Sequence, residues 1–219
     1  MAKPLILINF KTYKESFGNK ALDLARKISK VRKNNYQIAI APSLLTIKEI
    51  AQKTNLMVFS QHTDDDELGA HTGSILASEL KAIGVKGTIL NHSERKVPLP
   101  ELKKIVKLCK LKNLKTVICA STISEIKKVA QLHPHYIAYE PKEFIGGNIS
   151  VTEAKPEIIV RAVEVVKYLS PKTKVLCGAG IHSKEDLGHA LLLGTEGVLI
   201  GHAASKAKDP KKFLESMLI

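Results

Sequence analysis

The sequence contains no tryptophan, and it has only three cysteines and four arginines among its 219 residues. An odd number of cysteines, each within an apolar stretch, excludes a small disulfide-stapled scaffold and favours reduced thiols in a reducing compartment. The longest apolar runs, such as Leu5–Ile8 and Gly197–Ile200, are far shorter than the ~18 residues of a membrane-spanning helix. The N-terminal residues lack the apolar core of a signal peptide. These absences predict a soluble, cytoplasmic protein.

Acidic residues are also scarce relative to basic ones: the chain has 34 Lys and Arg residues but only 21 Asp and Glu residues, which gives a net charge of +13. Such a balance can indicate binding to nucleic acid or to a membrane surface. The lysines, however, are spread over nearly every expected helix, and few arginines and aromatics are available to read or stack bases. We therefore expect a lysine-rich solvated surface that attracts anionic ligands, with no specific nucleic-acid partner and no membrane partner.

Short apolar, β-branched segments recur along the chain with a helical segment between successive ones. Near-continuous apolar strands of this kind are typical of a parallel sheet that is covered on both faces. Between them, positions such as Leu102, Ile105 and Cys109 keep helical spacing. The expected strands are Leu5–Asn9, Gln37–Ala41, Met57–Ser60, Gly87–Asn91, Thr116–Ala120, Tyr136–Glu140, Lys174–Gly178 and Gly197–Gly201.

Eight alternating repeats predict an α/β protein with a (β/α)8 barrel. Because 219 residues is short for this fold, which typically needs ~250, the helices are expected to be shortened. No linker or low-complexity stretch divides the chain, so residues 1–219 are expected to form one domain. The alternative is an open doubly wound sheet, which would normally carry a Gly-x-Gly-x-x-Gly turn after its first strand. The sequence there is Phe10-Lys11-Thr12-Tyr13, which favours the barrel.

Polar residues or glycine-containing turns follow several of the expected strands. In a barrel these positions meet at the C-terminal face, where barrel enzymes place their chemistry. They bring a carboxylate, an imidazole, an ammonium group and anion-binding turns to one mouth, which predicts proton transfer on a small phosphorylated substrate. The residues are Asn9, Lys11, His92, Glu140, Gly178-Ala179-Gly180 and Gly201-His202-Ala203.

Three of these strand ends carry longer motifs. In order along the chain, these motifs resemble the signature segments of the triosephosphate isomerase family. They are Asn9-Phe10-Lys11, Asn91-His92-Ser93-Glu94-Arg95 and Tyr139-Glu140-Pro141. Gly69–Gly73 resembles the subunit-contacting third loop of that family, and the short length resembles its archaeal-type branch. The chain departs from the family where Lys142–Gly147 lacks the usual tryptophan after the catalytic Glu-Pro.

A second departure is Gly180, which stands where the seventh loop of the family usually ends in serine. Phosphate held by backbone N–H groups would survive both changes. The resemblance implies an isomerase that interconverts dihydroxyacetone phosphate and D-glyceraldehyde 3-phosphate through an enediolate, in glycolysis and gluconeogenesis. It implies no metal and no organic cofactor.

The resemblance also implies a role for each residue. Glu140 would be the general base and His92 a neutral electrophile, with Lys11 and Asn9 binding the substrate. We expect Ser93-Glu94-Arg95 to open a helix whose N-terminal dipole disfavours the imidazolium form of His92.

The substrate phosphate is expected on backbone N–H groups after the seventh and eighth strands. Lys142–Ile145 would act as a lid between hinges at Pro141 and Gly146-Gly147. The implied assembly is a homo-oligomer, with a tetramer preferred over a dimer. The full substrate-binding set is Asn9, Phe10, Lys11, Ile145, Gly180, Gly201 and His202.

Two other functions remain open at this stage. A phosphoribosyl isomerase barrel would share the glycine turns, but it would not need the Asn9 and His92 motifs together. An RNA- or anion-binding module would explain the net charge of +13 but not a general base beside a lid hinge. The acidic run Asp64–Glu67 could suggest a cation site, although it lacks a spaced ligand pattern and is expected to be a solvated loop.

Overall fold

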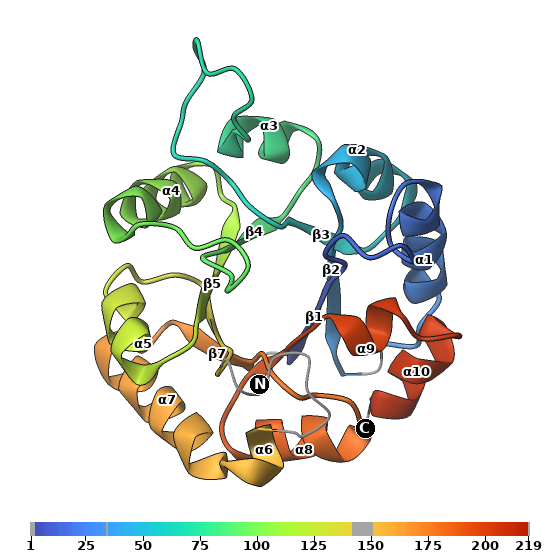
Figure 1. The fold of residues 1–219 in the computed structure, drawn as a ribbon, viewed down its shortest axis with the longest axis vertical. Helices are drawn as coiled ribbons and strands as arrows, with labels where there is room; N and C mark the ends of the chain where they lie inside the picture. Colours follow the sequence, from blue (N-terminus) through green and yellow to red (C-terminus); the bar gives the residue numbers. More distant parts are fainter. Residues whose placement is uncertain (1–2, 34, 142–150, 219) are drawn as a thin grey trace.

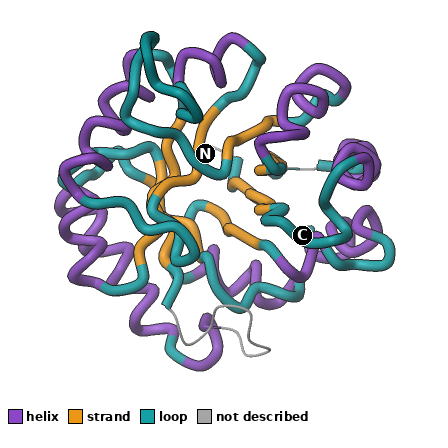
Figure 2. The backbone as a smooth tube through the Cα atoms, turned by 45° about the horizontal axis from the view of Figure 1, so that its top comes forward, coloured by secondary structure: helices purple, strands orange, loops and turns teal. Residues whose placement is uncertain are grey.

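In this computed structural model, residues 3–33, 35–141 and 151–218 are described. Eight parallel strands close into a barrel in chain order, and helices form a ring around it (Figure 1). Figure 2 shows the same arrangement from another side, with the strands at the centre and the helices outside. The expected (β/α)8 barrel is confirmed, and the open doubly wound sheet is excluded.

The strand boundaries agree with the sequence pattern to within one residue. The first three strands match it, β5 begins one residue earlier, and β4, β6, β7 and β8 each end one residue earlier. The residues that leave the ladder are therefore Asn91, Glu140, Gly178 and Gly201, which lie at the mouth of the barrel. The strands are β1 Leu5–Asn9, β2 Gln37–Ala41, β3 Met57–Ser60, β4 Gly87–Leu90, β5 Lys115–Ala120, β6 Tyr136–Tyr139, β7 Lys174–Cys177 and β8 Gly197–Ile200.

Several helices are short, as expected for a barrel of this length. The helix α3, for example, has six residues. A capping box between Ser183 and Asp186 starts α8, and proline occupies the first turn of α7 and of α10. The helices are α1 Asn19–Ser29, α2 Leu44–Lys53, α3 Ala77–Ala82, α4 Leu99–Leu111, α5 Ile123–Ala130, α6 Val151–Ala154, α7 Pro156–Leu169, α8 Lys184–Leu192, α9 His202–Ser205 and α10 Pro210–Met217.

One expected helix start is wrong. Ser93-Glu94-Arg95 forms a turn, in which the Arg95 N–H donates to the His92 carbonyl at 2.9 Å, and α4 begins only at Leu99. Pro98 explains the difference, because it has no N–H to bond an earlier carbonyl and disfavours helical conformation at Val97 before it. A helix dipole at residue 93 therefore cannot account for the state of His92.

The core has two layers because strand side chains alternate between two faces. In β1, Leu5 and Leu7 point into the barrel, whereas Ile6 and Ile8 pack outward against the helices. All three cysteines are buried free thiols, in agreement with their apolar surroundings in the sequence. Within the described part of the chain, no helix has both the length and the apolar character needed to cross a membrane.

Candidate active site

A cavity opens at the C-terminal mouth of the barrel and gathers most of the predicted site residues. Phe10 is not among its lining residues, because its side chain is fully buried and its N–H donates to the Ala41 carbonyl at 3.0 Å. Ile145 and the expected lid and second hinge, 142–147, lie outside the described residues. The predicted residues that line the cavity are Asn9, Lys11, His92, Glu140, Gly180, Gly201 and His202.

Glu140 follows β6 and is almost completely buried, with 4% of its surface exposed. Burial raises the pKa of its carboxyl to about 7, against smaller lowering effects from a hydrogen bond with the Cys119 thiol and from the charge of Lys11. Its Oε2 atom is buried without a hydrogen-bond partner among the residues that the structure describes. An unpartnered carboxylate oxygen at a cavity wall is free to accept a proton from a bound molecule.

His92 faces Glu140 across the cavity, with its Nε2 atom 3.6 Å from Glu140 Oε1. The pKa of His92 is lowered to about 4, mainly by burial and also by the positive charges of Lys11 and Lys96, against a smaller raising effect of the Glu94 charge. The Glu94 N–H donates to His92 Nδ1 at 3.2 Å, so the neutral ring carries its proton on Nε2. The imidazole is therefore neutral at pH 7 and presents an N–H to the cavity.

Lys11 follows β1 in a left-handed backbone conformation, with φ at 47°. Its N–H donates to Asn9 Oδ1 at 3.0 Å, and its Nζ donates to Glu94 Oε1 at 2.6 Å. Burial lowers the pKa of Lys11, but the hydrogen bond and charge of Glu94, together with smaller contributions from Tyr13 and Glu140, raise it overall. Lys11 is therefore a fixed positive charge beside His92 and Glu140.

The residue directly after β7, Gly178, has no room for a side chain. A Cβ atom at this position would lie 2.4 Å from Glu140 Cγ and 3.2 Å from the Tyr139 carbonyl oxygen. Any side chain would therefore displace Glu140.

Some contributors to the site were not expected from the sequence. These contributors are Cys119, which contacts Glu140, and Tyr13 and His182, which line the cavity. No local motif marks Cys119, although the period-two alternation of β5 does place it inside the barrel with Val117. Glu94 lay within a recognised motif, but its bonds to Lys11 and His92 depend on the turn geometry.

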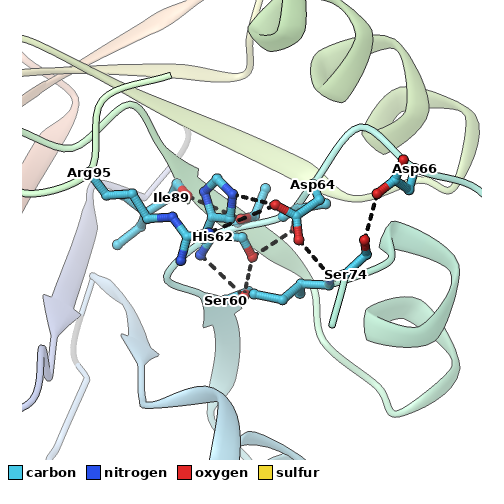
Figure 3. Close-up of polar contacts among 10 residues, drawn as sticks. Ser60, His62, Asp64, Asp66, Ser74, Ile89 and Arg95 are labelled. Atoms are coloured by element: carbon cyan, nitrogen blue, oxygen red, sulfur yellow. Dashed lines mark hydrogen bonds and ion pairs between the residues drawn. The ribbon is translucent and has the colours of Figure 1, made fainter. Parts of the chain in front are cut away.

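In the acidic run Asp64–Glu67 of the third loop, Asp64 and Asp66 are hydrogen-bonded or ion-paired with neighbouring side chains of the protein (Figure 3). Asp64 Oδ1 lies 2.9 Å from His62 Nε2 and 3.8 Å from Arg95 Nη2, while Asp66 Oδ2 accepts from the Ser74 hydroxyl at 2.5 Å. These carboxylates brace the loop. Among the residues described, no group of three or more His, Cys, Asp or Glu side chains is placed to hold a metal ion.

A closed βα barrel with a buried carboxyl, a neutral imidazole and an ammonium group at its C-terminal mouth defines the class as the (β/α)8-barrel enzymes. The comparison with known families is specific. The family model for triosephosphate isomerase matches residues 4–217. The chain therefore belongs to the triosephosphate isomerase family, and it is an isomerase.

Named relatives cover essentially the whole chain. The triosephosphate isomerase of Methanothermus fervidus is 41% identical over 219 residues, which are 100% of this chain and 99% of the relative. That of Methanocaldococcus jannaschii is 41% identical over 215 residues, 98% of each chain. That of Methanosarcina mazei is 41% identical over 219 residues, 100% of this chain and 99% of the relative. These methanogens are archaea, in agreement with the resemblance to the archaeal-type branch.

Proposed function

We propose that the protein interconverts dihydroxyacetone phosphate and D-glyceraldehyde 3-phosphate, as a step of glycolysis and gluconeogenesis. The observation that supports this most strongly is the pairing of Glu140 Oε1 with His92 Nε2 at 3.6 Å, beside Lys11 in the cavity at the mouth of the barrel. The reaction moves one proton between adjacent carbons and the hydroxyl proton between the two oxygens that these carbons carry, while the double bond shifts within the substrate, so it needs no oxidant and no cofactor.

In this proposal Glu140 is the general base. It takes the carbon-bound proton, an enediolate forms, and the same carboxylic acid returns the proton to the neighbouring carbon. A carboxyl with a pKa of about 7 is a stronger base than an ordinary glutamate and is still substantially ionised at neutral pH. Its burial therefore serves the reaction directly.

His92 is the electrophile. Its Nε2–H donates a hydrogen bond to the substrate carbonyl oxygen, on which negative charge develops in the enediolate. Because Glu94 fixes the ring tautomer, this donor is present before the substrate binds. Lys11 adds a full positive charge beside the developing oxyanion, and Asn9 orients the substrate.

The phosphate is proposed to bind backbone N–H groups at Gly180, Gly201 and His202. These positions line one side of the cavity and follow β7 and β8, where barrels commonly hold phosphate. Gly180 has φ at 66°, a turn conformation that glycine adopts without a steric cost. Lys11 attracts the phosphate through its charge.

A coupled spectrophotometric assay of glyceraldehyde 3-phosphate isomerisation tests this function. The wild-type protein should turn over the substrate, and Glu140→Gln should lower kcat by at least ~10²-fold, because it retains shape but cannot accept the proton. Glu196→Gln is a matched control, since Glu196 bonds the Val175 N–H just before β8, at the opposite end of the barrel. An inactive wild-type protein, or a Glu140→Gln variant within about threefold of wild type, would contradict the proposal.

We also propose a cytoplasmic location and a homo-oligomer, with a tetramer preferred over a dimer. The third loop supports association, because Gly69–Gly73 is exposed and the neighbouring Leu68 is 82% exposed. Contiguous exposed apolar patches commonly mark interfaces, and Leu68 offers apolar surface to such a contact. Light scattering at micromolar concentration should give a mass well above the 24.0 kDa of one chain, and a monomer would refute association.

A further inference from the structure

Lys11 occupies a backbone conformation that a non-glycine residue adopts only under constraint. Its φ of 47° lies in the left-handed region, where the Cβ atom crowds the backbone. Such conformations persist where surrounding contacts over-determine them, and they cluster at functional sites. The groups that hold Lys11 are therefore of interest for the site.

Three hydrogen bonds hold Lys11, at its backbone N–H, its carbonyl oxygen and its side-chain ammonium group. Asn9 Oδ1 accepts from its N–H at 3.0 Å, and Glu94 Oε1 accepts from its Nζ at 2.6 Å. The third bond comes from Gln61, whose Nε2 donates to the Lys11 carbonyl oxygen at 3.0 Å. Gln61 follows β3, 50 positions away in the chain, and is half-buried.

The Gln61 amide also ties Lys11 to the end of β2. Nε2 donates a second hydrogen bond to the Ala41 carbonyl oxygen at 2.9 Å, and the same oxygen accepts from the Phe10 N–H at 3.0 Å. One amide nitrogen therefore bridges the peptide after Lys11 and the last residue of the neighbouring strand. Only a side-chain amide of this length offers two such donors without adding a charge.

We propose that Gln61 is a positioning residue for Lys11, holding its peptide in the left-handed conformation that directs the ammonium group into the cavity. If the Lys11 carbonyl lost this donor, the residue could relax towards an ordinary negative φ. That rotation turns the side chain about the backbone and separates Nζ from Glu94 and from the substrate. The relevance of Gln61 to catalysis rests on the proposed function, whereas its effect on the position of Lys11 does not.

The test uses Gln61→Met in the full chain, because methionine has a similar length and no donor. Two quantities are measured: kcat/KM for glyceraldehyde 3-phosphate, and the Kd of glycerol 3-phosphate, which carries the phosphate and cannot be isomerised. We expect Gln61→Met to lower kcat/KM at least tenfold and to weaken glycerol 3-phosphate binding at least threefold. Thr195→Val is the matched control, since it removes a buried hydroxyl that donates to the Ala190 carbonyl at 2.7 Å near the opposite end of the barrel. It should lower Tm while leaving both quantities within twofold of wild type.

A double-mutant comparison separates positioning of Lys11 from a general structural role. If Gln61 acts through Lys11, adding Gln61→Met to Lys11→Met should change the Kd of glycerol 3-phosphate by less than twofold. An equal further loss in that background would overturn the proposal, as would a folded Gln61→Met variant with wild-type binding. If Gln61→Met does not fold, Gln61→Asn, one methylene too short to serve both carbonyls, is subject to the same two outcomes. A wild-type protein without isomerase activity would refute the proposed function, whereas the binding comparison would still decide the role of Gln61.

Discussion

Replacing Glu140 by glutamine should stabilise the protein at alkaline pH while it abolishes most of the activity. Burial raises the pKa of this carboxyl from an ordinary value of 4.5 to about 7 in the folded protein. Above pH 7 the native state must therefore hold an ionised carboxylate in a site that disfavours charge. Glutamine has nearly the same shape and never ionises, so the variant does not incur this cost.

The size of the effect follows from proton linkage. Below pH 4.5 the carboxyl is protonated in both states and contributes no pH dependence. Between pH 4.5 and about 7 the native state binds more protons than the unfolded state, so stability falls as pH rises. At 1.36 kcal/mol per pH unit, the gap between the two pKa values corresponds to a loss of about 3 kcal/mol in wild type. The loss is complete above pH 7.

Urea unfolding of wild type and Glu140→Gln at pH 4, 5, 6, 7 and 8 measures this directly. The difference in the free energy of unfolding should move in favour of the variant by about 3 kcal/mol between the lowest and highest pH. Any constant offset, for instance from an unsatisfied amide proton of the glutamine, cancels in this comparison. A difference that stays constant within ~1 kcal/mol over the range would refute the raised pKa of Glu140.

Three further outcomes follow from the same geometry. First, a plot of log kcat/KM against pH should rise with unit slope up to about pH 7, as Glu140 ionises. Because the pKa of His92 is about 4, this residue should add no second limb between pH 5 and 8. An acid limb with its midpoint below pH 5 would contradict the raised pKa of Glu140. Lys11→Met should abolish most of the phosphate-substrate binding while changing the free energy of unfolding by no more than ~1 kcal/mol, and normal kinetics in this variant would remove Lys11 from the site. Gly178→Ala should lower kcat at least tenfold and destabilise the fold by ~1–3 kcal/mol, because its Cβ would lie 2.4 Å from Glu140 Cγ. Gly201→Ala, whose Cβ would come no closer than 3.5 Å to Lys11 Cε, should cost less stability, and equal losses in the two variants would contradict the steric argument.

The barrel was predictable because its signal is local and repeated. Apolar segments such as those of β1 and β2 are bounded by proline or polar residues (Pro4 and Asn9 for β1, Gln37 and Pro42 for β2), and their boundaries agree with the structure to within one residue. The start of α4 was not, since the cap-like Ser93-Glu94-Arg95 is followed by Pro98, which delays the helix to Leu99. Helix initiation depends on the residues downstream as well as on the cap.

The composition of the site was predictable from its motifs, but its electrostatics were not. The family resemblance implied that Phe10 binds substrate along with Asn9 and Lys11, whereas the Phe10 side chain is buried and does not line the cavity. The burial of Glu140 and its contact with Cys119 depend on β5 and β6 lying side by side. Such contacts join residues far apart in the chain, so no spacing in the sequence reveals them.

Burial raises the pKa of Glu140 and lowers the pKa of His92, because it disfavours the charged form of each group. Burial alone favours the neutral form of both groups, with the proton on the carboxyl. The charge of Lys11 then lowers both pKa values, which keeps His92 neutral and returns Glu140 towards the ionised form that a base requires. Lys11 remains charged because Glu94 pairs with it, and the same residue fixes the His92 tautomer through its N–H. The distribution of protons in the mouth is therefore set mainly by burial and adjusted by one ammonium group, whose position depends on the backbone conformation that the loops after β1, β3 and β4 hold together.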